Sequence, residues 1–123
     1  MTLINRMLFN RMLWSVAAVT LAAAAATPPA TAQDAATVEK GKAVYAAQKC
    51  SMCHTIAGSG NKSSPLDGVG KKLTAEQIRE WIVDPKAATA KAKSTKKPLM
   101  PEKYSKLPAA DLDALVAYMA SLK

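Results

Sequence analysis

Five consecutive residues constrain this chain more than any other feature. The motif Cys50-Ser51-Met52-Cys53-His54 contains both cysteines and the only histidine of the 123 residues. In a helical turn, positions i and i+3 lie on one face, so two thiols at this spacing can add to the two vinyl groups of one porphyrin. The histidine that follows is then placed to offer its imidazole to the iron. The motif therefore predicts covalent haem attachment through Cys50 and Cys53, with His54 as an axial ligand.

Two other kinds of site use the same residue types. A C-x-x-C pair also occurs in thiol–disulfide redox sites, but these usually open a helix in a fold that contains a sheet. No strand-like alternation of useful length is present in this sequence. A zinc site needs about four nitrogen or sulfur ligands, and only Cys50, Cys53 and His54 are available. Haem attachment is therefore the favoured interpretation.

The N-terminal segment has the pattern of an export signal. Two arginines and no acidic residue precede an apolar run over residues 12–26, which is shorter than the ~20 residues of a membrane-spanning helix. Ala30-Thr31-Ala32 then supplies a small-x-small cleavage pattern. We expect residues 1–32 to be a cleavable secretory signal peptide and residues 33–123 the mature domain, exported to the periplasm by the general secretory route. A retained membrane anchor is the alternative.

The mature domain has little material for a core of its own. Trp81 and three tyrosines are its only aromatic side chains, and a domain this small usually needs a disulfide framework, a metal or a large prosthetic group. The two cysteines are too close in sequence to close a long loop. A buried haem would supply the missing apolar contacts.

Helical signals mark three segments, residues 37–49, 74–84 and 109–122. Thr74 and Gln77 form a capping box at the start of the second segment, and Asp84-Pro85 is expected to end it. In the third segment a buried stripe is predicted at i, i+3, i+4 and i+7, formed by Leu112, Leu115, Val116 and Met119.

The remaining segments predict irregular structure. Residues 33–36 predict a short mobile tail, and residues 57–70 a loop rich in Gly, Ser, Asn and Pro. Residues 86–98 predict a basic connector in which a weak helical turn can form. With no internal repeat, the pattern predicts one small all-α domain of three main helices.

From about Val38 to its C-terminus the chain resembles the class I c-type cytochromes. Glu39-Lys40-Gly41, with Tyr45 ahead of C-x-x-C-H, looks like the first helix of that family, and residues 115–119 look like its last. The resemblance implies a small cytochrome c fold wrapped around one covalently bound haem c. In that family the two helices cross closely, which implies that Gly41 is small so that Tyr118 can pack against it.

The resemblance also suggests roles for two further residues. Pro65 is similar to the loop proline of the family, whose carbonyl would accept a hydrogen bond from Nδ1–H of His54; an ordinary turn proline is the alternative. Trp81 is similar to a tryptophan that donates to a haem propionate in some relatives, and the alternative is a core aromatic. Both are assigned here as cofactor-binding residues.

The second axial ligand must be a methionine, a lysine, water or nothing, because His54 is the only histidine. Met52 lies between the two cysteines and cannot reach the far face of the haem. Met119 belongs to the stripe of the last helix, where core packing is its expected role. Met100 lies in the proline-bracketed segment Leu99-Met100-Pro101, which resembles the ligand loop of the family. We assign Met100 as the second iron ligand, with a core methionine as the alternative.

Ligation by His and Met fills both axial positions and favours reduced iron, which is suited to an electron carrier rather than an enzyme. The net charge is +8, of which two positive charges lie in the signal segment. Nine lysines lie between the haem loop and the last helix: Lys71, Lys72, Lys86, Lys91, Lys93, Lys96, Lys97, Lys103 and Lys106. They predict steering onto acidic docking patches of redox partners, with an ordinary solvated face as the alternative.

The sequence therefore predicts a periplasmic, monohaem, one-electron carrier that is monomeric and not stably inserted in a membrane. Export and the absence of any suitable motif argue against nucleic-acid binding. One alternative is a haem c subunit of an oxidoreductase complex. Another is an enzyme or gas sensor with an open iron site, which requires that Met100 does not bind. The electron donor and acceptor are not identified by the sequence.

Overall fold

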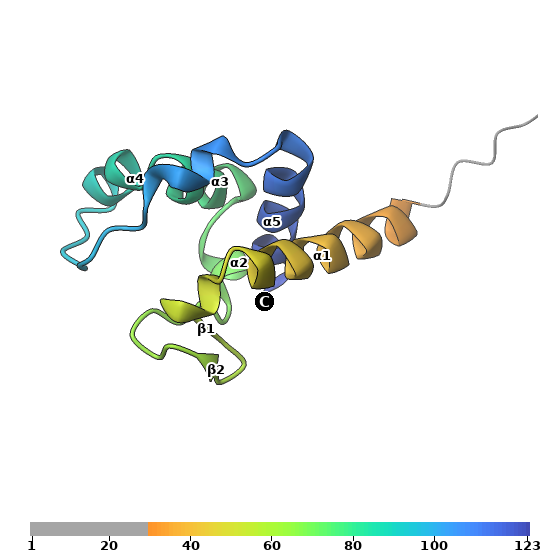
Figure 1. Cartoon of the computed structure of the whole chain (residues 1–123), viewed down its shortest axis with the longest axis horizontal. Helices are drawn as coiled ribbons and strands as arrows, with labels where there is room; N and C mark the ends of the chain where they lie inside the picture. The colour runs from red at the N-terminus through yellow and green to blue at the C-terminus, as the bar shows by residue number, and fades with distance from the viewer. Residues whose placement is uncertain (1–29) are drawn as a thin grey trace, which may run out of the picture.

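The computed structural model describes residues 30–123, so most of the predicted signal peptide, residues 1–29, lies outside the described residues. The helices are α1 (Ala30–Ala47), α2 (Val69–Lys72), α3 (Ala75–Val83), α4 (Pro85–Lys91) and α5 (Ala109–Ser121), with 3₁₀ turns η1 (Cys50–Met52) and η2 (Glu102–Lys106). The strands β1 (Thr55–Ile56) and β2 (Ser59–Gly60) form a short hairpin. Figure 1 shows this arrangement.

The predicted all-α fold is confirmed, with α1, α3 and α5 as the three main helices and two shorter helices beside them. The expected tail over residues 33–36 is wrong, because α1 already begins at Ala30. Its Ala-rich sequence favours this extension. Among the residues that the structure describes, no helix has the length and apolar character needed to cross a membrane.

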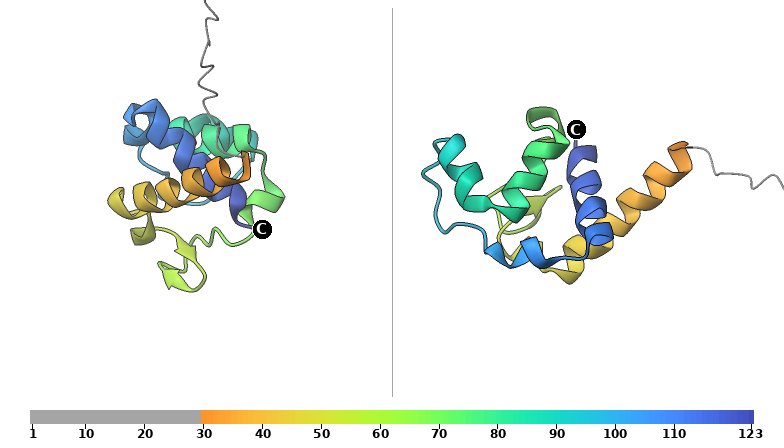
Figure 2. Two further views of the ribbon diagram at one scale, coloured as in Figure 1. Left: turned by 90° about the vertical axis from the view of Figure 1, so that its right-hand side faces the viewer. Right: turned by 90° about the horizontal axis from the view of Figure 1, so that it is seen from above.

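The crossing of α1 and α5 is the most extensive contact between helices, and α5 lies between α1 and α3 in both Figures 1 and 2. Gly41 of α1 sits at the crossing. A Cβ atom at this position would lie 2.1 Å from the carbonyl oxygen of Ala114 and 2.6 Å from Cβ of Tyr118. The close approach expected for Gly41 and Tyr118 is therefore confirmed. The Tyr118 ring also meets Tyr45 edge-on, with ring centroids 5.9 Å apart.

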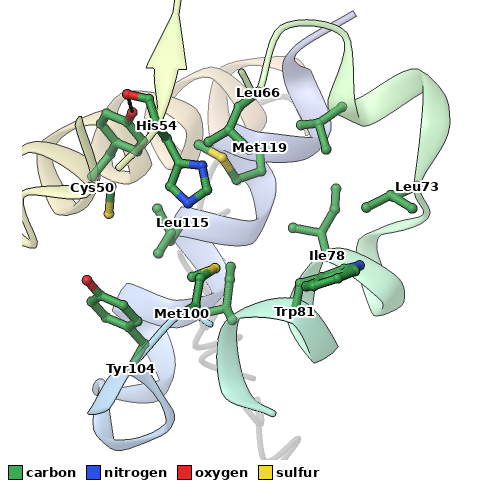
Figure 3. Close-up of a pocket in the computed structure, with 13 residues that line it drawn as sticks. Cys50, His54, Leu66, Leu73, Ile78, Trp81, Met100, Tyr104, Leu115 and Met119 are labelled. Atoms are coloured by element: carbon green, nitrogen blue, oxygen red, sulfur yellow. Dashed lines mark hydrogen bonds between the residues drawn. The ribbon is translucent and has the colours of Figure 1, made fainter. Parts of the chain in front are cut away.

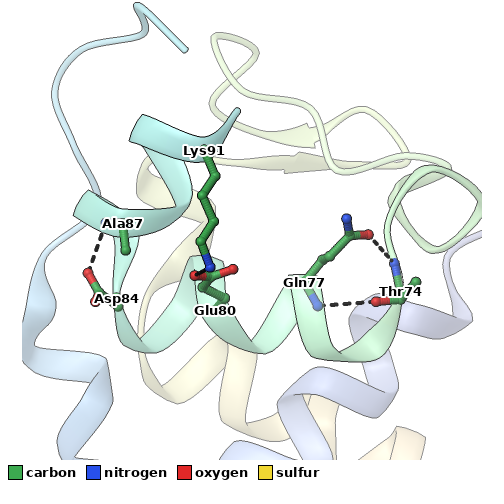
Figure 4. Close-up of polar contacts among 6 residues, drawn as sticks. All are labelled: Thr74, Gln77, Glu80, Asp84, Ala87 and Lys91. Atoms are coloured by element: carbon green, nitrogen blue, oxygen red, sulfur yellow. Dashed lines mark hydrogen bonds and ion pairs between the residues drawn. The ribbon is translucent and has the colours of Figure 1, made fainter. Parts of the chain in front are cut away.

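The helix α3 begins as predicted. The Thr74 hydroxyl accepts from the Gln77 amide at 3.3 Å, and the Gln77 side chain accepts from the Thr74 amide at 2.9 Å (Figure 4). Leu73 and Ile78 join the same apolar core, as expected for a hydrophobic staple.

The basic connector after α3 contains more helix than the weak turn that the sequence allowed, because residues 85–91 form α4. Asp84 ends α3, but its carboxylate accepts from the Ala87 amide at 2.9 Å and so caps α4, in which Pro85 is the first residue (Figure 4). Proline is well suited to this position because it lacks only an amide that the helix leaves unpaired. An ion pair between Lys91 and Glu80 (2.5 Å) then ties α4 to α3.

The last helix carries the centre of the core. Its predicted stripe is confirmed, since all four residues are buried: Leu112, Leu115, Val116 and Met119. They pack against Val44 of α1 and against Ile78 and Ile82 of α3. This core holds α1, α3 and α5 together on one side of the region that contains the C-x-x-C-H motif.

Candidate functional site

An apolar cavity of about 210 Å³ lies among the motif, α3 and α5. Its walls come from elements far apart in the sequence, and Figure 3 shows how they converge. The lining residues that were expected from sequence to contact haem are Cys50, His54, Trp81 and Met100. The rest of the wall is mostly aliphatic and includes Leu66, Leu73, Ile78, Ile82 and Leu115. A wall of this composition suits an apolar group.

A second cavity of about 420 Å³ adjoins the first, and the two share Cys50, His54, Met100 and Tyr104. Its outer wall is more polar and carries three lysines, Lys49, Lys96 and Lys97. The Nζ atom of Lys96 donates to the Ser63 carbonyl oxygen at 3.1 Å. The two cavities together therefore run from an apolar interior to a positively charged mouth.

The imidazole of His54 is fixed by a hydrogen bond. Its Nδ1–H donates to the carbonyl oxygen of Ser64 at 3.0 Å, which leaves Nε2 as the free ring nitrogen. Figure 3 shows the ring directed into the cavity. The expected acceptor, the Pro65 carbonyl, is therefore wrong by one residue.

The reason lies in a parallel bridge between Thr55 and Pro65. The Thr55 amide donates to the Ser64 carbonyl oxygen at 3.3 Å, and the Leu66 amide donates to the Thr55 carbonyl oxygen at 2.8 Å. Successive carbonyls alternate in direction along an extended segment. Because the Ser64 carbonyl points toward His54 in this register, the Pro65 carbonyl points away from it. Pro65 is itself one of the two residues of the bridge, and its ring fixes the backbone direction at this point.

The three methionines of the predicted mature domain occupy different environments. Met100 points into the cavity from the side opposite His54 (Figure 3). Met52 is 68% exposed and does not line either cavity. Met119 is buried in the core and also touches the first cavity. Only Met100 faces the His54 ring across the space.

The two cysteines of the motif both line the second cavity, and Cys50 also lines the first. Both are free, with Cys50 partly buried and Cys53 exposed. The amides of Cys53 and His54 both donate to the Cys50 carbonyl, at 3.1 and 3.0 Å, so the motif is a compact turn. Burial raises the pKa of the Cys50 thiol.

Three aromatic residues complete the site. Trp81 is partly buried and lines the apolar cavity, as expected, while Tyr104 lines both cavities. Burial raises the pKa of Tyr45 to about 12, so its hydroxyl stays protonated and is directed at the His54 carbonyl, at 3.4 Å.

These residues fit a covalently attached haem. One imidazole nitrogen and one thioether face each other across an apolar space. Cys50, with a free thiol, lines both cavities, and Cys53, also free, lines the second. His54 and Met100 would hold the iron, and Cys50 and Cys53 would attach the porphyrin. Among residues 30–123 no cluster of three or more His, Cys, Asp or Glu could hold a separate metal ion.

The comparison with protein families agrees with this site. Residues 38–123 match the family model described as cytochrome c. The chain therefore belongs to the cytochrome c family, whose members carry covalently attached haem c with its iron and generally act in electron transfer. Searches of curated proteins and of solved structures gave no match.

Several site residues could not be found from the sequence. Ser64 acts through its backbone carbonyl and Asn61 lines the second cavity, and the contacts of both depend on the path of the loop. For Tyr104 the sequence offered one weak indication of a place in the site, because it is an aromatic residue shortly after Met100. The aliphatic wall from Leu66 and Leu73 follows from packing alone.

Proposed function

We propose that this chain carries single electrons through one haem c, attached at Cys50 and Cys53 and ligated by His54 and Met100. The observation that carries the proposal is the opposition of His54 and Met100 across an apolar cavity that Cys50 also lines, with Cys53 on the adjoining cavity. The bound haem supplies a one-electron couple at its iron. The chain's own residues then determine which oxidation state is favoured and what else can reach the metal.

Each ligand has a distinct task. The Ser64 carbonyl holds the Nδ1 proton of His54, which fixes the tautomer so that Nε2 is free to bind iron. A neutral thioether from Met100 favours the reduced state. With His54 and Met100 both bound to the iron, small molecules such as oxygen would have no open site. The aliphatic wall excludes water, and a dry site disfavours the extra charge of ferric haem.

The mouth of the second cavity supports docking to acidic redox partners. Lys49, Lys96 and Lys97 line it beside the exposed Cys53. No carboxylate of the described residues lines this cavity. Of the nine in the chain, Glu39, Glu80, Asp111 and Asp113 pair with lysine or arginine. Steering by this charge predicts electron-transfer rates that fall steeply as salt rises. A rate that does not change with salt would contradict docking through this surface.

We place the protein in the periplasm as a monomeric carrier. The support is the N-terminal segment, which has the pattern of a secretory signal, and the family, which is typically extracellular or periplasmic. Purification from a periplasmic fraction as a single polypeptide is the expected result. Constant copurification with a larger polypeptide would instead favour a haem subunit of an oxidoreductase complex.

The decisive experiment is a visible spectrum of protein matured with haem-attachment machinery. We expect sharp reduced c-type bands and, in the oxidised protein, a far-red charge-transfer band from sulfur to iron. Met100→Ala should remove the far-red band and let carbon monoxide bind the reduced iron. Met52→Ala, at an exposed methionine, should change neither.

Each alternative result has a clear meaning. Haem bands without the far-red band in the unmodified protein would refute Met100 as ligand and favour a sensor or an enzyme. Complete absence of haem would refute the attachment and favour a thiol–disulfide redox site at Cys50 and Cys53.

A further inference from the structure

The attachment turn is held from outside by the hairpin that follows it. The turn η1 is short, and the carbonyls near its C-terminal end have no partner within it. The chain then runs through β1, reverses at Ala57 and Gly58, and returns through β2. Both reversing residues have positive φ (50° and 79°), the geometry of a tight two-residue hairpin. The return brings Gly60 and Asn61 back against the turn.

Asn61 satisfies two of these carbonyls at once. Its amide nitrogen donates to the Ser51 carbonyl at 3.0 Å, and its side-chain Nδ2 donates to the Met52 carbonyl at 3.0 Å. Its Oδ1 accepts from the Ser63 amide at 3.0 Å. Because oxygen and nitrogen of the side chain are both engaged, its orientation is fixed. Both residues between the two cysteines are therefore held by Asn61.

Gly60 allows this approach. Its φ is 105°, and a Cβ atom there would lie 2.2 Å from the His54 carbonyl oxygen and 3.0 Å from that of Ser51. Any other residue would force the hairpin away from the turn. Two neighbouring residues therefore make the contact: Gly60 lets the hairpin approach the attachment turn, and Asn61 donates hydrogen bonds to the carbonyls of that turn.

The two thiols do not depend equally on this contact. Cys50 is partly buried, and its carbonyl is bonded within the turn. Cys53 is exposed, and the peptide group before it is the one whose carbonyl receives Nδ2 of Asn61. The peptide group before Cys53 is therefore held from two sides, by the turn through the Cys53 amide and by Asn61 through the Met52 carbonyl.

We propose that Asn61 is a positioning residue for the second thioether, holding Cys53 where its thiol can add to the haem vinyl group. This rests on the proposed attachment at Cys50 and Cys53. Attachment adds each S–H across a vinyl double bond, sulfur to one carbon and hydrogen to the other, without net oxidation or reduction. Loss of the contact lets the turn open at Cys53, so haem is attached through Cys50 alone in part of the protein.

The test counts free thiols in holoprotein matured in cells. The protein is unfolded, alkylated and weighed, and the position of the reduced band in alkaline pyridine reports any vinyl group that remains. In Asn61→Ala and Asn61→Asp, the fraction with an alkylated Cys53 should rise about five-fold or more, the factor that loss of one hydrogen bond gives. Asn61→Asp keeps an acceptor for the Ser63 amide but removes the donor to Met52.

Two controls separate positioning from general destabilisation. Lys62→Ala changes the neighbouring exposed side chain, and Thr74→Ala removes the cap of α3 without removing a hydrogen bond of the attachment turn; neither should release a thiol. A wild-type thiol count in Asn61→Asp, or an equal rise in Thr74→Ala, would overturn the proposal. The unmodified protein run in parallel distinguishes this failure from failure of the proposed function, which would appear there as absent haem.

Discussion

Replacing Gly41 by alanine tests the crossing of α1 and α5 most directly. The added Cβ would meet the Ala114 carbonyl oxygen at 2.1 Å and Cβ of Tyr118 at 2.6 Å. Neither atom lies at the end of a flexible side chain, so the helices themselves must move apart by more than an ångström to restore ordinary contact. Overpacking of this kind costs up to about 3 kcal/mol, and the better helix propensity of alanine offsets about 1 kcal/mol.

The expected net loss for Gly41→Ala is therefore about 2 kcal/mol of unfolding free energy. For a domain of this size that corresponds to a fall of roughly 10 °C in Tm. Guanidinium unfolding of the haem-loaded protein, followed by helical circular dichroism, would measure it. Ala43→Gly, at an exposed position of the same helix, measures the propensity contribution separately. An unchanged or higher midpoint for Gly41→Ala would refute the close crossing.

Three further predictions concern α3 and the hairpin. Thr74→Ala removes the cap of α3 and should cost about 1 kcal/mol in the same unfolding assay; no loss would contradict the capping role. The pKa of Glu76 is lowered from 4.5 by its backbone amide and then by Thr74, so it stabilises the fold above that pH and the contribution is lost on acidification. Glu76→Gln should flatten the acid side of a plot of Tm against pH, and parallel curves would count against this. Gly60→Ala should lower stability more than Gly58→Ala, because both have positive φ but only Gly60 lies against the His54 carbonyl; equal losses in thermal melts would exclude the contact.

Local signals predicted the parts of the fold that depend on near neighbours. The capping box of Thr74 and Gln77 forms as expected, and the stripe of α5 is buried, because caps and helical faces involve residues three or four apart. The same reasoning underestimated α4, for which it allowed only a weak helical turn. Asp84 and Pro85 were interpreted as an end, although a capping aspartate followed by proline also marks a helix start.

The sequence by itself determined the cofactor chemistry of this protein. Cys50, Cys53 and His54 are adjacent, so their spacing alone defines a motif for haem attachment. The wall around them was not determined in this way. Apolar side chains from α3 and α5 converge on the motif only after the helices pack. The hydrophobic effect is non-directional, so an apolar pattern in the sequence does not show which residues will meet.

Only the tertiary structure decided which groups orient the site. It brought Met100 opposite His54, made Ser64 rather than Pro65 the acceptor for the imidazole, and returned Asn61 to the attachment turn. These contacts join residues about ten or more positions apart. Their partners are set by the register of the Thr55–Pro65 bridge and the β1–β2 hairpin, where a shift of one residue exchanges the carbonyl that faces the site.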